Sequence, residues 1–573
     1  MSRLGELARM FPCQRPVGLI GWVLFGAVLV QGCGFRSTPA DLVLHNGLIL
    51  TMDAASSEAQ AVAVRGGRIV EVGAERAILN KYSATREVDL MGAVVVPGLM
   101  DAHAHFVGFA KGLANADLTG TTSEAEVLAR TREHGERYPG DWVLGRGWDQ
   151  NDWDDTKFPD RAEALDAMFP DRPVLLERVD GHAVWANQVA LERAGFDPET
   201  VIFGGELLRN DAGELTGVLL DKAADSLQAW VPEPDSTQLA ALMVEAGRRV
   251  SAVGLTHITD AGLGPDEVAA LEAVQASGEV RQRFSVMVSD QPDALDHFLP
   301  LGPRIDTAGK LDVRAVKFYM DGALGSRGAA LLEPYADRPD SKGLFLQDET
   351  EYREKLERVK AAGFQVATHC IGDAAVRRVQ QHYGELLGGV NDLRWRIEHA
   401  QVVHKADVQP FTDFTIIPSV QPTHATSDMY WAGQRLGRNR VRRAYIYKRL
   451  KAQLGWIPLG TDFPVEGISP LRTFYAAVVR KDVEGYPEGG FQSDEALSRE
   501  DALRGMTGSA ALACFRENDL GQIAPGYRAD FTVLDGNLLT APEDALLDVR
   551  VLQTWIGGEA VFELDVTSSV MYP

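Results

Sequence analysis

Two histidines separated by one residue, His103 and His105, are the side chains of this sequence that most clearly indicate chemistry. They end a run that starts at Val94 with three valines and is broken by Pro97-Gly98. The β-branched residues predict a buried strand, and the Pro-Gly pair predicts an interruption in it. Residues i and i+2 of an extended segment face the same way, so both imidazoles are expected to project from one strand end. Two neutral imidazoles side by side are suitable metal ligands.

Four more potential ligands end strand-like segments further along the chain: Lys317, His369, His399 and Asp462. In a barrel of alternating strands and helices, the carboxyl ends of the strands carry the active site. These four residues could therefore converge with the two histidines on one mouth, where nitrogen and oxygen ligands suit Zn²⁺ or Mn²⁺. Each residue is ambiguous by itself. The lysine could be salt-bridged, His399 could be a core histidine beside Glu398, and Asp462 could be a turn carboxylate.

The elements that must position these residues alternate between helix and strand. Asp348 and Glu351 have the spacing of a helix N-terminal cap, Gly363 is suited to end that helix, and a strand pattern follows at once. Such alternation predicts a parallel sheet. Residues 97–514 are therefore expected to form an α/β domain, a (β/α)8 barrel of the TIM type. A stretch at about 110–250 is rich in Trp, Asp and Gly, and we expect it to be an inserted subdomain over the barrel mouth.

The two ends of the chain share a different pattern, with short strands and tight turns. Residues 41–96 contain several apolar runs separated by turn residues, and Gly66-Gly67 between two of them predicts a hairpin. Residues 515–573 contain strand patterns of the same kind. Neither piece is large enough to bury a good core alone. The two pieces are therefore expected to form one small β-sandwich domain together.

The N-terminal residues have the organisation of a secretory signal. Arginines precede an apolar stretch over residues 17–30, which is too short for a comfortable membrane span. The stretch leads into Leu-Val-Gln-Gly-Cys, which resembles a bacterial lipobox in all but its glutamine. Residues 1–32 are therefore expected to be a signal peptide, Cys33 to be lipidated, and residues 33–40 to be a tether. A plain signal peptide and an uncleaved anchor are the alternatives.

Lipidation of Cys33 would place the protein in the bacterial cell envelope, with the lipid anchor in the outer or cytoplasmic membrane and the protein on the periplasmic or external side. The 573 residues carry a net charge of −24 without a long basic run, which argues against a nucleic-acid partner. The hydrophobic share of 45% is ordinary for a globular protein. Only Cys33, Cys370 and Cys514 follow the signal, so the fold is not expected to depend on disulfides.

The motifs around the potential ligands, taken together, resemble the amidohydrolase superfamily. The likeness is closest to amidohydrolase family 3, the group that includes N-substituted formamide deformylase, and it runs from about residue 41 to residue 565. The sequence departs from the family pattern at Thr461, where a serine is common. The matching segments are residues 97–105, 145–150, 180–183, 316–317 with 321–322, 369–374, 398–401, 460–464 and 529–531.

The resemblance implies a role for each potential ligand. His103 and His105 would hold the more buried metal, His369 and His399 would hold a second one, and a carboxylated Lys317 would bridge the two. A lysine ammonium would repel a metal cation, so a lysine in a metal site must lose its positive charge, as carboxylation would achieve. Asp462 would bind metal and act as the catalytic acid and base. The cofactor is therefore expected to be one or two divalent ions, with zinc the first choice.

The implied reaction is hydrolysis of a carbon–nitrogen bond other than a peptide bond, in which a metal-activated hydroxide attacks a small N-substituted amide or formamide. The residues expected to bind this substrate are His182, Trp148, Asp321 and His424. Trp148 could equally pack in a core. The alternatives are a deaminase or a cyclic amide or ester hydrolase of the same superfamily, and a non-catalytic envelope binding protein. A homodimer is compatible with the sequence, which leaves the oligomeric state open.

Overall fold

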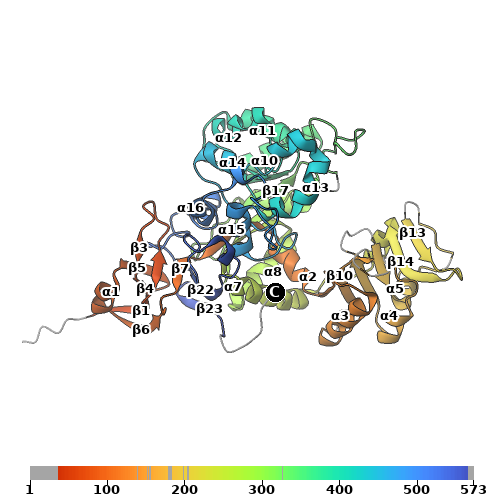
Figure 1. Ribbon diagram of the computed structural model, residues 1–573, viewed down its shortest axis with the longest axis horizontal. Helices are drawn as coiled ribbons and strands as arrows, with labels where there is room; N and C mark the ends of the chain where they lie inside the picture. The colour runs from red at the N-terminus through yellow and green to blue at the C-terminus, as the bar shows by residue number, and fades with distance from the viewer. Residues whose placement is uncertain are drawn as a thin grey trace, which may run out of the picture.

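The computed structural model describes residues 37–138, 140–150, 153, 157–178, 183–197, 199–202, 205–325 and 327–565. The sheets form three bodies, which are a central barrel, a β-sandwich and an inserted domain, and the last two lie on opposite sides of the barrel (Figure 1). The predicted signal peptide, Cys33 and His182 lie outside the described residues. None of the helices that the described residues form is both long and apolar enough to span a bilayer.

The barrel is a parallel sheet with the strand order β20-β19-β18-β17-β16-β15-β8. Residues 459–463 fill the gap between its two edge strands, because Ala102 N donates to Leu459 O (3.1 Å) and Gly460 N donates to Val420 O (3.0 Å). The closed sheet is a barrel of the TIM type, which confirms the predicted fold class. Its strands are β8 (Leu99–Ala104), β15 (Leu255–Leu263), β16 (Arg283–Ser289), β17 (Leu311–Tyr319), β18 (Gln365–Cys370), β19 (Arg396–His399) and β20 (Ile417–Ser419).

Helices surround the barrel and pack apolar side chains against its strands. The cap predicted at Asp348 is present, since its side chain accepts hydrogen bonds from the amides of Thr350 and Glu351 at the start of α10. Leu356 of that helix and Val366 of β18 belong to the same buried core. The helices are α2 (Phe106–Gly112), α7 (Ser236–Ala252), α8 (Pro265–Ser277), α9 (Pro292–Phe298), α10 (Glu349–Ala361), α11 (Asp373–Leu387), α12 (Gln409–Asp413), α13 (Thr423–Arg440), α14 (Tyr447–Leu454), α15 (Pro470–Val479), α16 (Arg499–Gly505) and α17 (Gly508–Ala513).

The β-sandwich takes strands from both ends of the chain, in two sheets ordered β5-β4-β1-β6 and β23-β22-β21-β7-β2-β3. Ile49 and Val95 from the N-terminal part share its core with Phe531 and Trp555 from the C-terminal part. The elements are β1 (Thr38–His45), β2 (Leu48–Leu50), β3 (Glu58–Ala59), β4 (Ala61–Arg65), β5 (Arg68–Gly73), α1 (Glu75–Lys81), β6 (Tyr82–Asp89), β7 (Val94–Pro97), β21 (Phe531–Leu534), β22 (Val551–Ile556) and β23 (Glu559–Glu563).

Strand β1 corrects the expected tether. It begins at Thr38, and residues 38–40 pair in parallel with residues 82–84 of β6, so the tether predicted over residues 33–40 includes three residues of the sandwich. Backbone pairing outweighs the polar composition that suggested a linker.

The predicted break at Pro97-Gly98 is the boundary between the sandwich and the barrel. Strand β7 pairs with β21 in the sandwich, whereas β8 pairs with β15 in the barrel. A Cβ atom on Gly98 would lie 2.3 Å from Thr256 Oγ1 of β15. The chain at Gly98 therefore passes too close to β15 to carry a side chain. The close approach to Thr256 of β15 therefore explains the glycine at this position.

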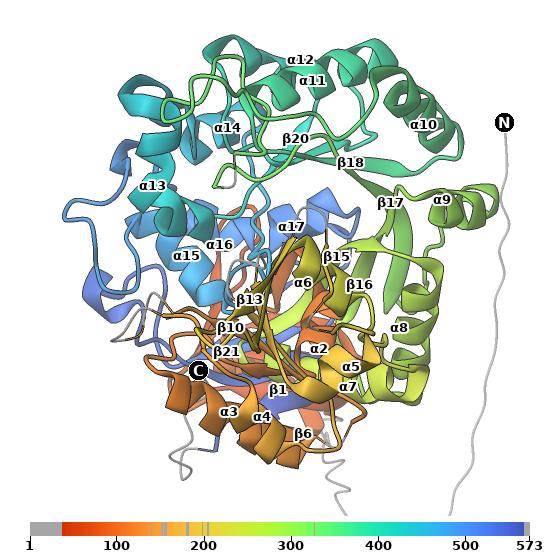
Figure 2. The ribbon, with the colours of Figure 1, turned by 90° about the vertical axis from the view of Figure 1, so that its right-hand side faces the viewer.

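The inserted domain lies between α2 and α7 in the chain, and it is nearest the viewer in Figure 2. Its sheet has the order β13-β14-β12-β11-β10-β9. The predicted end of the insertion at about residue 250 is too late, because α7 is buried against the barrel core rather than in this domain. The elements are β9 (Asn115–Asp117), α3 (Glu124–Arg137), β10 (Val143–Trp148), α4 (Glu163–Met168), β11 (Val174–Arg178), β12 (Ala183–Ala186), α5 (Gln188–Arg193), β13 (Gly205–Arg209), β14 (Leu215–Asp221) and α6 (Lys222–Gln228).

Candidate metal centre

The structure brings the predicted metal ligands together at the barrel mouth. The ring centroid of His103 lies 5.6 Å from that of His105 and 5.1 Å from that of His399. His399 in turn lies 4.5 Å from His369. Lys317 Nζ lies 3.2 Å from His103 Nε2. The convergence follows from the fold, because each residue stands at or just after the carboxyl end of a barrel strand.

Asp462 completes this group from the segment that closes the barrel. Its Oδ1 atom lies 3.5 Å from His103 Nε2 and 3.3 Å from His105 Nε2. The backbone is held in register, since Asp462 N donates to His103 O (2.8 Å). Asp462 and His399 both adopt positive φ angles, of 65° and 70°, which are uncommon for residues other than glycine. Such backbone conformations are tolerated where the surrounding contacts fix a side chain for function.

Hydrogen bonds behind the two N-terminal histidines orient their rings. His105 Nδ1 lies 2.9 Å from Ala261 O, which can only accept, so this nitrogen carries the proton. His103 Nδ1 lies 2.6 Å from Glu398 Oε2. Burial alone would raise the pKa of Glu398, but Arg396 and His103 lower it to about 2, so the carboxylate is ionised and accepts. In both rings Nε2 therefore presents its lone pair to Asp462, as metal-binding histidines do.

The protonation states suit a cation. Burial lowers the pKa of His103 to about 4 and that of His369 to about 3, and it lowers the pKa of His399 well below its usual value. Burial opposes ionisation of Asp462, but the nearby imidazoles of His105 and His424 hold its pKa well below the usual range. Near neutral pH the buried imidazoles are neutral and the carboxylate is charged, which is the state that binds metal.

The geometry also fits a metal ion. Ligands held about 2.0–2.2 Å from a tetrahedral zinc lie about 3.3–3.6 Å apart. The distances from Asp462 Oδ1 to the two histidine nitrogens, 3.3 and 3.5 Å, fall in that interval. His399 Nδ1 and His369 Nε2 are buried without hydrogen-bond partners among the described residues. Unpaired buried nitrogens cost free energy unless something else binds them, so the residues present fit a divalent metal.

Lys317 is only 1% exposed on β17. Burial, the dominant effect, lowers the pKa of its ammonium group to about 8. In mildly alkaline solution, Lys317 is therefore a neutral amine in a substantial fraction of the molecules. A neutral amine is the form that reacts as a nucleophile, which makes this lysine suited to chemical modification.

His424, which the sequence analysis assigned to substrate binding, contacts the metal ligands directly. Its Nε2 lies 3.0 Å from Asp462 Oδ2 and its Nδ1 lies 3.1 Å from Glu466 Oε1. Burial would lower the pKa of His424, but the two carboxylates raise it well above its usual value. Sequence reasoning missed Glu466, although its position four residues after Asp462 was an available signal. Ser427 Oγ also donates to Glu466 (2.6 Å), which fixes the carboxylate.

Asp321 is fully buried and organises the loops around the mouth. Its carboxylate accepts hydrogen bonds from the amides of Ile371 (2.9 Å), Gly372 (2.7 Å) and Ala330 (2.8 Å). These bonds fix the chain that follows His369. The structure thus shows Asp321 in a positioning role, and its predicted contact with substrate stays a prediction.

Trp148 lies in the core of the inserted domain and is 0% exposed. Its indole N–H donates to Leu176 O (2.8 Å), and its ring packs 5.8 Å from that of Trp153. Of the two roles considered for Trp148, packing accounts for these contacts, and the predicted substrate contact stays a prediction. His182 lies outside the described residues.

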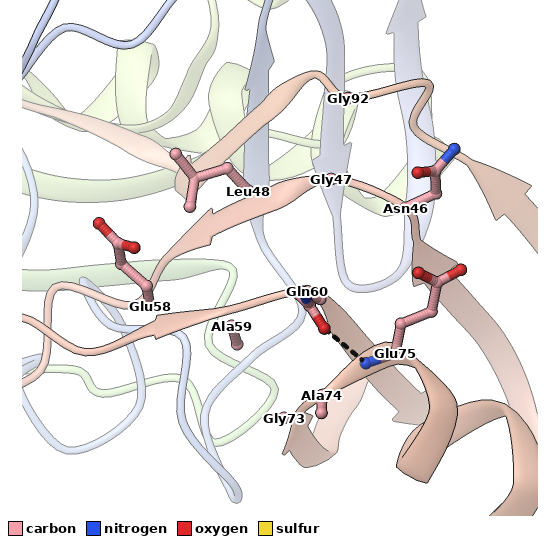
Figure 3. Close-up of a pocket in the computed structure, with 10 residues that line it drawn as sticks. All are labelled: Asn46, Gly47, Leu48, Glu58, Ala59, Gln60, Gly73, Ala74, Glu75 and Gly92. Atoms are coloured by element: carbon pink, nitrogen blue, oxygen red, sulfur yellow. Dashed lines mark hydrogen bonds between the residues drawn. The ribbon is translucent and has the colours of Figure 1, made fainter.

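A surface pocket of about 620 Å³ lies in the sandwich domain, away from the barrel mouth (Figure 3). Its lining includes Glu58 and Glu75, and Glu75 N donates to the Gln60 side chain across one wall (3.3 Å). None of the predicted site residues lines this pocket. The strand ends of the barrel, not this hollow, are therefore the candidate active site.

Comparison with known proteins identifies the family of the chain. The chain matches the amidohydrolase family over residues 86–562. It is 31% identical over 538 residues to Bacillus subtilis YtcJ, with 91% of this chain and 99% of that protein covered. It is 29% identical over 547 residues to N-substituted formamide deformylase of Arthrobacter pascens, with 91% and 98% covered. The crystal structure of a metal-dependent hydrolase from Pyrococcus horikoshii is similar with a TM-score of 0.73 at 26% identity, over 88% of this chain and 99% of that one.

The barrel and its histidine–aspartate centre thus define a metal-dependent hydrolase. This chain belongs to the amidohydrolase family, as its motifs predict. Its enzyme class is therefore that of hydrolases acting on carbon–nitrogen bonds other than peptide bonds.

Proposed function

We propose that this enzyme hydrolyses the carbon–nitrogen bond of a small N-substituted amide or formamide. The observation that carries the proposal is the placement of Asp462, which faces His103 and His105 with one oxygen and His424 with the other. The relative named N-substituted formamide deformylase supports the choice of substrate class.

The metal would be held by His103, His105 and Asp462, with a second ion at His369, His399 and Lys317. Zinc is the proposed metal, because its preferred ligands are imidazole nitrogens and carboxylate oxygens in this number. When bound, it would lower the pKa of water and polarise the substrate carbonyl. A weakly basic carboxylate such as Asp462 is then sufficient as the proton acceptor.

Asp462 would move the proton during the reaction. Its carboxylate takes a proton from the attacking water as the bond between the water oxygen and the carbonyl carbon forms. It then delivers that proton to the nitrogen as the carbon–nitrogen bond breaks, which releases a carboxylic acid and an amine. His424 and its partner Glu466 fix the orientation of the carboxylate, because His424 Nε2 bonds Oδ2.

Lys317 would be carboxylated in the active enzyme. Its neutral amine attacks carbon dioxide, a bond forms between Nζ and the carbon, and one proton is released. The product is a carbamate, whose single negative charge is shared by two oxygens, in place of an ammonium group. The buried position beside His103 and the pKa of about 8 support this step. Lys317→Ala is expected to lose metal, and the intact protein is expected to carry the added mass of one CO2.

The direct test compares the parent enzyme with Asp462→Asn on a panel of N-substituted formamides and other small amides, at saturating zinc, with bound metal measured in parallel. We expect turnover by the parent and none by the variant, with zinc still bound. Asp407→Asn is the control, because Asp407 is a buried carboxylate that pairs with Arg377 outside the site. Full activity of Asp462→Asn would disprove the proposal. Turnover confined to cyclic amides, esters or aminated rings would favour the other reactions of this superfamily.

A further inference from the structure

Tyr319 stands at the opening of the metal centre and was not part of the sequence-based assignment. It ends β17, two residues after Lys317, so both side chains point to the same face of the strand. Lys317 is 1% exposed and Tyr319 is 37% exposed. The Tyr319 ring lies 4.6 Å from Lys317 Nζ and its centroid lies 5.4 Å from that of His369. The ring therefore lies between the metal ligands and the solvent.

The hydroxyl group of Tyr319 is available to a ligand. The described residues include no hydrogen-bond partner for it. A Cβ atom on Gly262, at the end of β15, would lie 3.6 Å from this hydroxyl, and the positive φ of Gly262 (104°) favours glycine there. Because residue 262 is a glycine, no side chain from this position occupies the space beside the Tyr319 hydroxyl. The phenol of a tyrosine keeps its proton near neutral pH and can donate it in a hydrogen bond.

We propose that the Tyr319 hydroxyl donates a hydrogen bond to the carbonyl oxygen of the substrate amide, and that its ring forms one wall of the substrate pocket. This inference rests on the proposed amide hydrolysis. The carbonyl oxygen becomes negatively charged as water adds to the carbon. A donor that is already in place strengthens its bond to that oxygen in the transition state, and typically contributes 10²–10³ in rate for a comparable oxyanion donor. Tyr319 is exposed at one edge, so we expect a smaller factor.

The test uses Tyr319→Phe, which removes the hydroxyl and keeps the ring. The matched control is Tyr486→Phe, because the Tyr486 ring is 55% exposed and stacks on Tyr430 outside the strand ends. Each zinc-loaded protein is assayed on the best formamide of the panel. The inhibition constant of an N-alkyl phosphonamidate, a tetrahedral mimic of the transition state, is measured for the same proteins, together with bound zinc.

We expect Tyr319→Phe to lower kcat about 10- to 100-fold with little change in KM, and to weaken phosphonamidate binding by a similar factor, at unchanged zinc content. Tyr486→Phe should equal the parent in every measurement. A kcat and an inhibition constant equal to those of the parent would overturn the role of Tyr319 and leave the proposed function intact. If the parent turned over none of the amides, the proposed function would fail and this inference with it.

Discussion

His103 Nδ1 lies 2.6 Å from Glu398 Oε2, and neither side chain has any exposed surface. The same carboxylate lies 2.6 Å from Arg396 Nε, so one buried anion serves a metal ligand and a buried cation. The Arg396 guanidinium also donates to Ala102 O (2.6 Å), next to His103 in β8. The buried ion pair of Glu398 and Arg396 therefore fixes the orientation of the His103 ring.

Glu398→Gln should weaken metal binding without removing a ligand. Glutamine has nearly the same shape but no charge, so it makes the His103 ring a poorer ligand. We expect zinc affinity to fall by about 10- to 100-fold, measured by competition with a chromophoric chelator. Glu495→Gln, which changes a buried glutamate that pairs with Arg449, is the control and should bind zinc normally. Equal affinities in all three proteins would show that Glu398 does not act through His103.

The metal-free protein should lose stability in acid through its buried histidines. The unfolded chain binds a proton at such an imidazole near pH 6.5, whereas folded His103 binds one only near pH 4. Unfolding therefore takes up a proton between these values, and acid favours it. Urea unfolding of the parent and of His103→Gln at several pH values measures the effect. The free energy of unfolding should decrease more steeply in the parent between pH 6.5 and pH 4, and parallel curves would contradict the pKa shift.

Asp530→Ala should destabilise the contact between the sandwich and the barrel. Asp530 forms two bonds with Arg283 at the start of β16, at 2.6 and 2.9 Å, and both residues are buried. Removing one partner of a buried ion pair leaves an uncompensated charge, at a cost of about 3–5 kcal/mol in the free energy of unfolding. Glu563→Ala removes the exposed pair with Arg86 and should cost at most about 1 kcal/mol. Chemical denaturation distinguishes the two, and equal losses would refute this role of the buried pair.

The envelope location remains a proposal that rests on the N-terminal sequence. We expect Cys33→Ser to block lipidation, so that the protein no longer partitions with membranes after expression in a bacterium. Mass spectrometry of the parent should find a lipid on Cys33 as the first residue of the mature chain. An N-terminus further along the chain, with no lipid, would instead indicate a plain signal peptide.

The ligand positions were accessible from the sequence because they depend on local rules. The spacing of His103 and His105 along one strand, and the rule that barrel strands end at the active site, place both rings without knowledge of distant contacts. Contacts that depend on tertiary packing could not be predicted in the same way. Glu466 meets His424 only because α13 and the loop after Asp462 lie side by side. Trp148 is buried because the inserted domain has its own core, which composition alone did not show.

Zinc content and formamide hydrolysis, measured on one preparation before chelation, after chelation and after zinc is restored, test the central claim most directly. The account predicts one or two zinc ions per chain and a turnover that disappears with the metal and returns with it. It also predicts that Asp462→Asn stays inactive at every stage. Turnover of the amide that persists without metal, or in Asp462→Asn, would contradict the account.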